Sequence, residues 1–347
     1  MKRHLAGLQV LRGLAATGVV VHHASSWLAR QNPTLTRVED LDLGTRGVEL
    51  FFVLSGFIIY FIHAADEKGP VSLQNYALKR FVRIFPITFM VVSLWFAFLV
   101  VLNAVGVTNE THSVLTWLSS ALIIPAVERP LPVVIWTLRH ELFFYLVFAC
   151  FFFSSRAFYV LLAIWALSCL AFTVRQSPDY SGVATLKYVL AGNLNLLFPM
   201  GVGVAALYLR AKGMRDTTGA FAVSVVALIV APIVLFNLPG LSSAARTLIY
   251  GAVSACAIFA ASGTPRRFPG LELIGDASFS IYLVHLLSFH FSVRLASPFV
   301  PNHPWIALLI MVTLGVAAGV GTYLCLEKPL LAAVTRWTRP FRAVRPA

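Results

Sequence analysis

Charged residues are scarce in this chain: Asp, Glu, Lys and Arg together make up 12% of its 347 residues. A typical soluble domain contains about 25% charged residues. Apolar residues instead reach 59%, and the mean hydropathy is +0.81. This balance excludes an ordinary soluble domain and predicts an all-α, polytopic membrane protein.

Acidic residues are especially few, with 14 Asp and Glu against 27 Lys and Arg, which gives a formal net charge of +13. In a soluble protein this surplus would indicate nucleic-acid binding. In a membrane protein, Lys and Arg collect in cytoplasmic loops and favour anionic lipid. We therefore expect membrane lipid as a partner and no nucleic acid.

Cysteine is also rare, and no pair of cysteines has a CxxC spacing. We expect the four cysteines to be small apolar side chains within helices, and we expect neither disulfides nor a metal site. No polar stretch is long enough to form an appended soluble domain. The sequence therefore predicts a single transmembrane domain over residues 1–347.

Apolar runs predict ten membrane spans, since a spanning helix needs about 20 mostly apolar residues. Most Lys and Arg residues fall in segments that lie inside if the amino terminus is inside. We therefore expect a multi-pass protein of the inner (plasma) membrane with both termini cytoplasmic, a central cavity, and a short basic tail over 327–347. The predicted spans are 8–29, 46–63, 86–106, 133–153, 157–174, 185–209, 218–236, 242–262, 276–297 and 304–326.

The first span contains ionisable residues, Arg12, His22 and His23. Such groups inside a membrane helix are costly, and they usually face a protein interior or a water-filled cavity. Arg12 and His23 are about three turns apart, so they share one helical face, roughly 16 Å apart along the axis. This layout favours an anionic ligand at Arg12 and proton chemistry at His23. His22 points about 100° away and could contact either substrate or a neighbouring helix.

Residues 71–85 are predicted to form an amphipathic, basic surface helix that ends where Pro86 begins the third span. Its polar face carries Arg80 and Arg83, one turn apart. That face could rest on anionic lipid. Alternatively, the two guanidinium groups could grip phosphate oxygens bidentately.

Spans two and four each carry a carboxylate near the end that the predicted topology places outside. Glu49 could be a solvated interfacial acid or part of a substrate site. Glu141 is followed by an unbroken apolar run, which puts it at a depth similar to that of His23. A carboxylate at that depth can orient an imidazole and stabilise its protonated form.

Span nine places Ser278, Tyr282 and His285 on one helical face. These polar groups could hydrogen-bond to neighbouring helices. They could equally line a substrate site.

Several of these stretches, taken in order, resemble the acyltransferase-3 family of integral-membrane acyltransferases, which modify cell-surface glycans and related molecules. LQVLRGLAATGVVVHH resembles the family's pattern of an arginine, ten residues and a histidine, here Arg12 and His23. KRFVRIFP resembles its R-x-x-R motif, here Arg80 and Arg83. Many members read W-S-L-x-x-E-E where this chain has WTLRHEL, so only Glu141 is carried across. Other blocks that match the family are GVELFFVLSGFII, GDASFSIYLVHL and EKPL.

The resemblance implies an acyl-CoA donor, usually acetyl-CoA, and an acceptor hydroxyl on a surface polysaccharide or its lipid-linked precursor. Arg12, Arg80 and Arg83 would hold the phosphates of the donor. A transporter of a glycolipid or small anion is the alternative function, but transporters often contain internal repeats, and none is visible here.

The same resemblance leads to a hypothesis for the chemistry. His23 would act as the general base, oriented by Glu141. Tyr282 or Ser278 would donate a hydrogen bond to the oxyanion. The residues expected to contact substrate are Glu49, His285 and His22.

Overall fold

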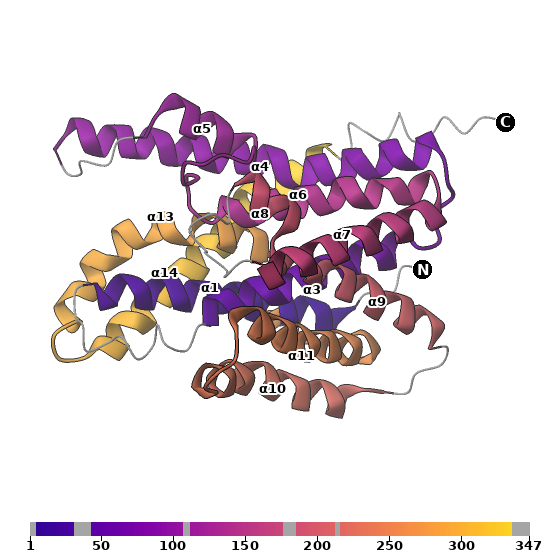
Figure 1. Ribbon diagram of the computed structural model, residues 1–347. Helices are drawn as coiled ribbons and strands as arrows, with labels where there is room; N and C mark the ends of the chain where they lie inside the picture. Colours follow the sequence, from indigo (N-terminus) through magenta and orange to yellow (C-terminus); the bar gives the residue numbers. More distant parts are fainter. Residues whose placement is uncertain (1–4, 31–42, 107–111, 176–184, 212–215, 335–347) are drawn as a thin grey trace. The chain divides into compact units, whose positions relative to one another are not determined.

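The computed structural model describes residues 5–30, 43–106, 112–175, 185–211 and 216–334 (Figure 1). All regular structure within these ranges is helical, and no strand occurs in them. Nine helices of this part of the chain are long and apolar enough to cross a membrane. The prediction of an all-α, multi-pass membrane protein is confirmed, while the central cavity and the cytoplasmic termini stay predictions.

The nine candidate spans coincide with nine of the ten predicted ones. The exception is the first, which forms helix α1 (Ala6–Ala29) but is not among the nine. With 24 residues α1 is long enough, and 14 of them are buried. A helix enclosed by protein can carry polar groups that a lipid-facing helix cannot. Residues 335–347, most of the predicted tail, lie outside the described part.

The packing divides the chain into two compact units. Unit 1 comprises 1–64, 169–178 and 193–320, and unit 2 comprises 65–168, 179–192 and 321–347.

Helix α1 forms the centre of unit 1. It contacts α3 (Leu43–His63), α11 (Ser243–Gly263), α12 (Pro269–Asp276) and α13 (Ser278–Ala296). Helix α9 (Leu197–Arg210) packs on α3, and α10 (Thr218–Asn237) lies beside α11, as Figure 1 shows. The α1 residues that carry ionisable groups are therefore surrounded by helices on several sides.

Glycine allows two pairs of helices in unit 1 to approach closely. A Cβ atom on Gly201 of α9 would lie 2.0 Å from the carbonyl oxygen of Val53, and one on Gly56 of α3 would lie 2.2 Å from that of Phe198. In α14 (Pro304–Thr322), a Cβ on Gly319 would lie 2.3 Å from the Cα of Ile281. Small residues at such crossings are typical of helix packing in membranes.

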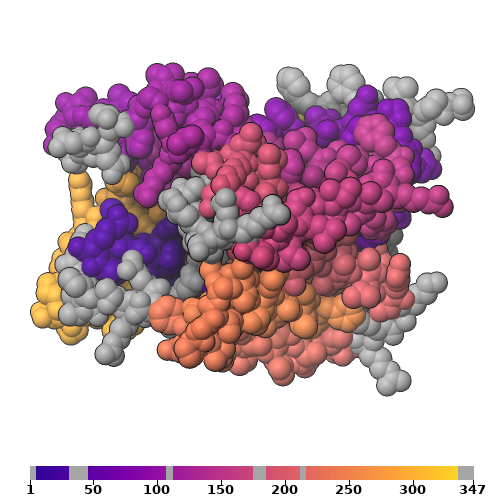
Figure 2. Space-filling view, in the orientation of Figure 1, coloured from indigo at the N-terminus to yellow at the C-terminus, as the bar shows by residue number. Residues whose placement is uncertain are grey.

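The outward face of α10 is apolar. Only four of its residues are buried, while Val223, Val226 and Ile233 are among the apolar side chains that it exposes. Figure 2 shows α10 and α11 at the surface in salmon and orange. An exposed apolar face on a helix of spanning length is typical of contact with lipid.

Unit 2 is built along α4 (Pro70–Ala104), which packs against α5 (Val114–Ala121) and α6 (Ile135–Ala149). The predicted boundary at Pro86 is wrong, because α4 continues through this proline as one helix of 35 residues. Proline is tolerated in membrane helices where neighbouring groups satisfy the released backbone carbonyl. At 1.5 Å per residue, α4 is about 50 Å long, so it extends beyond a hydrocarbon layer of about 30 Å.

The remaining elements are shorter or belong to both units. Helix α7 begins in unit 2 and ends in unit 1, and α14 continues into a π-helical turn, η6, in unit 2. Their bounds, with those of the other short elements, are α7 Ser155–Arg175, α8 Leu186–Ala191, η2 Cys150–Phe152, η4 Asn193–Leu196, η5 Ser297–Phe299 and η6 Tyr323–Glu327.

Candidate functional site

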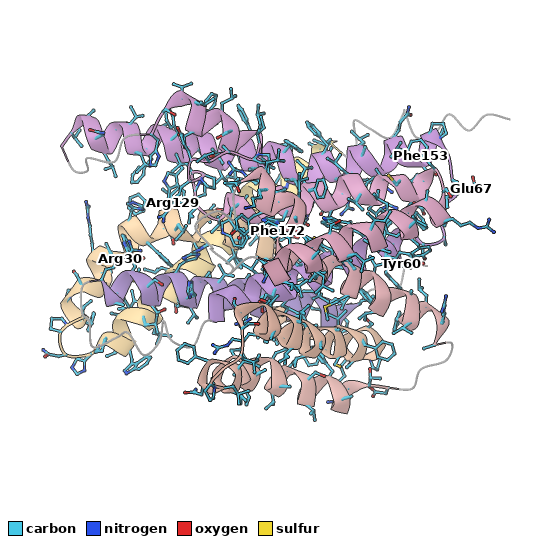
Figure 3. All side chains as sticks on the ribbon, viewed as in Figure 1. Arg30, Tyr60, Glu67, Arg129, Phe153 and Phe172 are labelled. Carbon is cyan, nitrogen blue, oxygen red and sulfur yellow. The ribbon has the colours of Figure 1, made fainter. Side chains whose placement is uncertain are left out.

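The imidazole rings of His23 and His285 stack on each other in unit 1. Their centroids are 5.3 Å apart and their planes differ by 28°. His23 is half-buried on α1, two turns before Arg30, which Figure 3 labels at the end of this helix. No described residue hydrogen-bonds to the His23 ring, so the geometry leaves its nitrogens available for proton transfer.

The face of α13 predicted to line a substrate site lies next to these rings. Ser278, Tyr282 and His285 are all buried, and the Tyr282 ring centroid is 6.3 Å from that of His285. The Ser278 hydroxyl has no hydrogen-bond partner among the described residues, and His285 bonds only to its own helix. These two side chains therefore form none of the interhelical hydrogen bonds of the alternative interpretation.

The other two polar residues of α1 have different surroundings. The His22 ring meets His23 edge-on, with centroids 5.2 Å apart. Arg12 is half-buried and donates from Nη1 to the Gln9 side chain at 3.1 Å. Next to it, Gly13 lies against the backbone of Gly275 on α12. The amino-terminal half of α1 thus packs on α12, and its carboxy-terminal half on α13.

Glu49 forms a buried ion pair, which corrects the interpretation of this residue as a solvated interfacial acid. Arg46 Nη1 donates to both Glu49 carboxylate oxygens, at 2.7 and 2.6 Å. Thr247 of α11 donates its hydroxyl to the same carboxylate at 2.6 Å, and the Arg46 guanidinium lies 5.7 Å from the Tyr250 ring centroid. With these partners, Glu49 links α3 to α11. Its predicted contact with substrate stays a prediction.

The basic face of α4 packs against α6 in unit 2. Tyr76 is buried and donates to the carbonyl of Tyr145 at 3.1 Å. The Arg80 guanidinium lies 5.8 Å from the Tyr145 ring centroid, and the Tyr145 hydroxyl donates to Glu141. Exposed Phe81 marks the opposite face of α4. Tyr76 and Arg80 of the polar face therefore contact α6, while contact of the half-buried basic face with anionic lipid stays an alternative.

Arg83 has a carboxylate partner that the sequence analysis did not assign. Its Nη1 lies 3.1 Å from Oε1 of Glu327, in the π-helical turn. The Glu327 side chain is 1% exposed, whereas that of Arg83 keeps 29% of its surface exposed. The EKPL block of the sequence contains Glu327, but no spacing within that block connects it with α4.

The structure thus brings some predicted residues together and leaves other pairings untested. His23, His22, Tyr282 and His285 form one aromatic cluster in unit 1. Glu141 belongs to unit 2, so its pairing with His23 stays a prediction. The phosphate site predicted from Arg12, Arg80 and Arg83 also stays a prediction, because Arg12 lies in unit 1 and the two α4 arginines lie in unit 2.

Arg46 and Tyr145 lay outside the sequence prediction, although each lies one helical turn from a predicted carboxylate. Arg46 and Glu49 are one turn apart on a single helix, so their spacing could have indicated the ion pair. Tyr145 is likewise one turn after Glu141. In both cases the residues between the two polar side chains are apolar, and the sequence analysis did not pair them.

Comparison with known proteins finds a family that this chain matches. A family model described as an acyltransferase domain matches residues 5–324. The exopolysaccharide production protein ExoZ of Rhizobium meliloti (strain 1021) is 27% identical over 300 residues, which cover 83% of this chain and 90% of ExoZ. Nodulation protein 10 of Rhizobium leguminosarum bv. viciae is 30% identical over 161 residues, or 41% of this chain and 43% of that protein.

A shorter similarity, 29% identity over 87 residues, connects the chain with a Staphylococcus aureus (strain COL) protein that is provisionally named an O-acetyltransferase. It covers 24% of this chain and 12% of that protein. No solved structure matches the chain.

Proposed function

The chain belongs to the acyltransferase family whose model spans residues 5–324, and from this premise we propose that it acetylates a surface polysaccharide or its lipid-linked precursor. The proposed donor is acetyl-CoA from the cytoplasm. The family match is the main support for the proposal, and the matched residues include both the histidine cluster and the α4 arginines. The name of ExoZ, which assigns that relative to exopolysaccharide production, supports a glycan acceptor.

In this proposal the arginines hold the donor. Coenzyme A carries several phosphate groups, and guanidinium groups bind phosphate with paired, charge-assisted hydrogen bonds. Arg80 and Arg83 lie one turn apart on the same face of α4, and Arg12 lies on α1. The donor's long arm would then bring the thioester towards His23.

The transfer step uses His23 as the general base. It takes the proton of the acceptor hydroxyl as that oxygen attacks the thioester carbonyl carbon. When the tetrahedral intermediate collapses, the carbon–sulfur bond breaks, and the proton on His23 goes to the leaving thiolate of CoA. The buried hydroxyls of Ser278 and Tyr282 are the proposed donors to the oxyanion.

Glu141 is the proposed orienting carboxylate. It already accepts a hydrogen bond from Tyr145. A carboxylate has about four lone-pair sites, so this bond does not prevent it from also accepting one from an imidazole.

The proposal is tested by mass spectrometry of surface glycans from cells that carry wild-type protein or the His23→Ala variant at equal membrane levels. We expect the acetyl groups to disappear with His23→Ala. The matched control is His303→Ala, since His303 is an exposed histidine before α14, and it should leave acetylation unchanged. Full acetylation with His23→Ala would remove His23 from the site. Flux of a glycolipid without consumption of acetyl-CoA would favour a transporter.

A further inference from the structure

His285 is enclosed on α13, with its ring against α1 and its Cβ atom near Gly315 of α14. None of its surface is exposed, and its ring stacks on that of His23. On the α14 side, a Cβ on Gly315 would lie 3.6 Å from the Cβ of His285. His285 is therefore held at a fixed place beside the proposed general base.

A hydrogen bond within α13 determines which ring nitrogen of His285 carries a proton. Its Nδ1 lies 3.0 Å from the carbonyl oxygen of Ile281. A carbonyl oxygen only accepts, so Nδ1 must be the donor. No described carboxylate pairs with this buried ring, which favours the neutral form. In a neutral imidazole with a protonated Nδ1, Nε2 is solely a hydrogen-bond acceptor.

This acceptor nitrogen lacks a partner. Nε2 of His285 is buried, and no described residue hydrogen-bonds to it. The hydroxyls of Ser278 and Ser292 share this property, and they lie seven residues before and after His285. Residues seven apart lie on one face of a helix. One face of α13 thus carries three buried polar atoms without partners, although buried polar groups normally have them.

We propose that Nε2 of His285 accepts a hydrogen bond from an O–H or N–H group of the substrate, beside the group that reacts at His23. The inference rests on the proposed function. Two sources offer this chemistry: a second hydroxyl of the acceptor sugar, and an amide N–H in the arm of the donor. In both cases His285 is a positioning residue that aligns the reactants while His23 moves the proton.

Two isosteric substitutions separate this role from a structural one. The amide oxygen of glutamine in His285→Gln takes the place of Nε2, but the variant loses the Nδ1 donor. The amide nitrogen in His285→Asn can still donate to Ile281, but this variant has no atom at Nε2. The proposal expects transfer with His285→Gln to exceed transfer with His285→Asn by about tenfold, which corresponds to about 1.4 kcal/mol. If the bond to Ile281 were the only function of His285, the order would be reversed.

The experiment measures acetyl groups per glycan in cells at matched membrane levels, and acetyl-CoA affinity by calorimetry on the purified proteins. Weaker acetyl-CoA binding by His285→Asn than by wild type would identify the donor as the bonded group. Equal binding with lower transfer would identify the acceptor hydroxyl. Equal transfer by the two variants, or more transfer by His285→Asn, would overturn the inference. A wild-type protein that transfers no acetyl group would instead contradict the proposed function.

A measurement on protein with an intact His285 covers the case in which a variant fails to fold. The Nδ1 of His290 also lies near a backbone carbonyl, that of Leu286 at 3.3 Å. In protein that carries His290→Gln, ¹⁵N spectra of the imidazoles should retain a neutral ring protonated at Nδ1. Spectra with only Nε2-protonated neutral rings would overturn the assignment of Nε2 as an acceptor.

Discussion

Arg83 and Glu327, from opposite ends of the sequence of unit 2, form an ion pair with a nitrogen–oxygen distance of 3.1 Å. One partner is buried and the other is partly exposed. Glu327 lies in a π-helical turn, a feature that is frequent at functional sites. The pair connects the EKPL block, which begins three residues after the family match ends, with the basic motif of α4.

Removing the charge of Glu327 should destabilise the protein. Glu327→Gln removes the carboxylate that pairs with Arg83 and buries an amide in its place. Losing one partner of a fully buried pair costs about 3–5 kcal/mol, and the partial exposure of Arg83 reduces this to about 1–3 kcal/mol. Thermal unfolding of the purified protein measures the effect. Glu67→Gln is the control, because Glu67, labelled in Figure 3, is exposed in the same unit. Equal melting temperatures of the two variants would contradict the pairing.

The arginines of α4 should determine the affinity for acetyl-CoA. Arg80→Ala and Arg83→Ala each remove charge-assisted hydrogen bonds, which contribute about 1.5–3 kcal/mol, so we expect binding to weaken about 10- to 100-fold. Calorimetry with acetyl-CoA measures the dissociation constant. Arg156→Ala, at an exposed arginine in the first turn of α7, should leave the dissociation constant unchanged. Unchanged affinity of Arg80→Ala and Arg83→Ala would count against the phosphate site.

The Arg46–Glu49 pair predicts a contrast between single and double substitutions. Glu49→Gln removes the carboxylate that pairs with the buried Arg46 guanidinium, and we expect a loss of about 3–5 kcal/mol. A double variant, Arg46→Met with Glu49→Leu, removes both charges and should recover most of that stability, with the Thr247 hydroxyl left unpaired. Chemical denaturation of all three proteins checks this expectation. A double variant less stable than Glu49→Gln would show that the pair itself holds α3 and α11 together.

Glycine at 201 should be indispensable for the contact between α3 and α9. A Cβ there would lie 2.0 Å from a backbone oxygen, so Gly201→Ala must push the helices apart, and overpacking of this kind costs about 1–3 kcal/mol. Gly203→Ala, on the same helix, meets nothing within 4 Å and should be neutral or stabilising. Thermal unfolding compares the two. A Gly201→Ala protein as stable as wild type would contradict the close approach.

Hydropathy predicted all nine candidate spans, but one local rule failed. Pro86 was expected to divide a surface helix from a span, yet α4 passes through it, because a long helix packed along its length can tolerate one lost hydrogen bond. The first span was expected to cross the membrane with its ionisable residues facing a protein interior or a cavity. It forms a largely buried helix at the centre of unit 1 with protein on several sides, and its crossing of the membrane stays a prediction.

The candidate site was predictable in part. The spacing on α13 correctly grouped Ser278, Tyr282 and His285, since residues on one helix have a known angular relationship. The stacking of His285 on His23 and the pairing of Glu327 with Arg83 could not be predicted in this way. Each joins two helices, and no spacing along either one specifies the contact.

The sequence by itself determined the class of the protein, the positions of most of its helices and the residues that carry its motifs. These are properties of local hydropathy and of spacing along a single helix. Only the tertiary structure decided which acid meets which base and which imidazole lies against His23. The reason is that such contacts depend on how each helix is rotated and shifted against its neighbours, and many distant apolar contacts set that arrangement together.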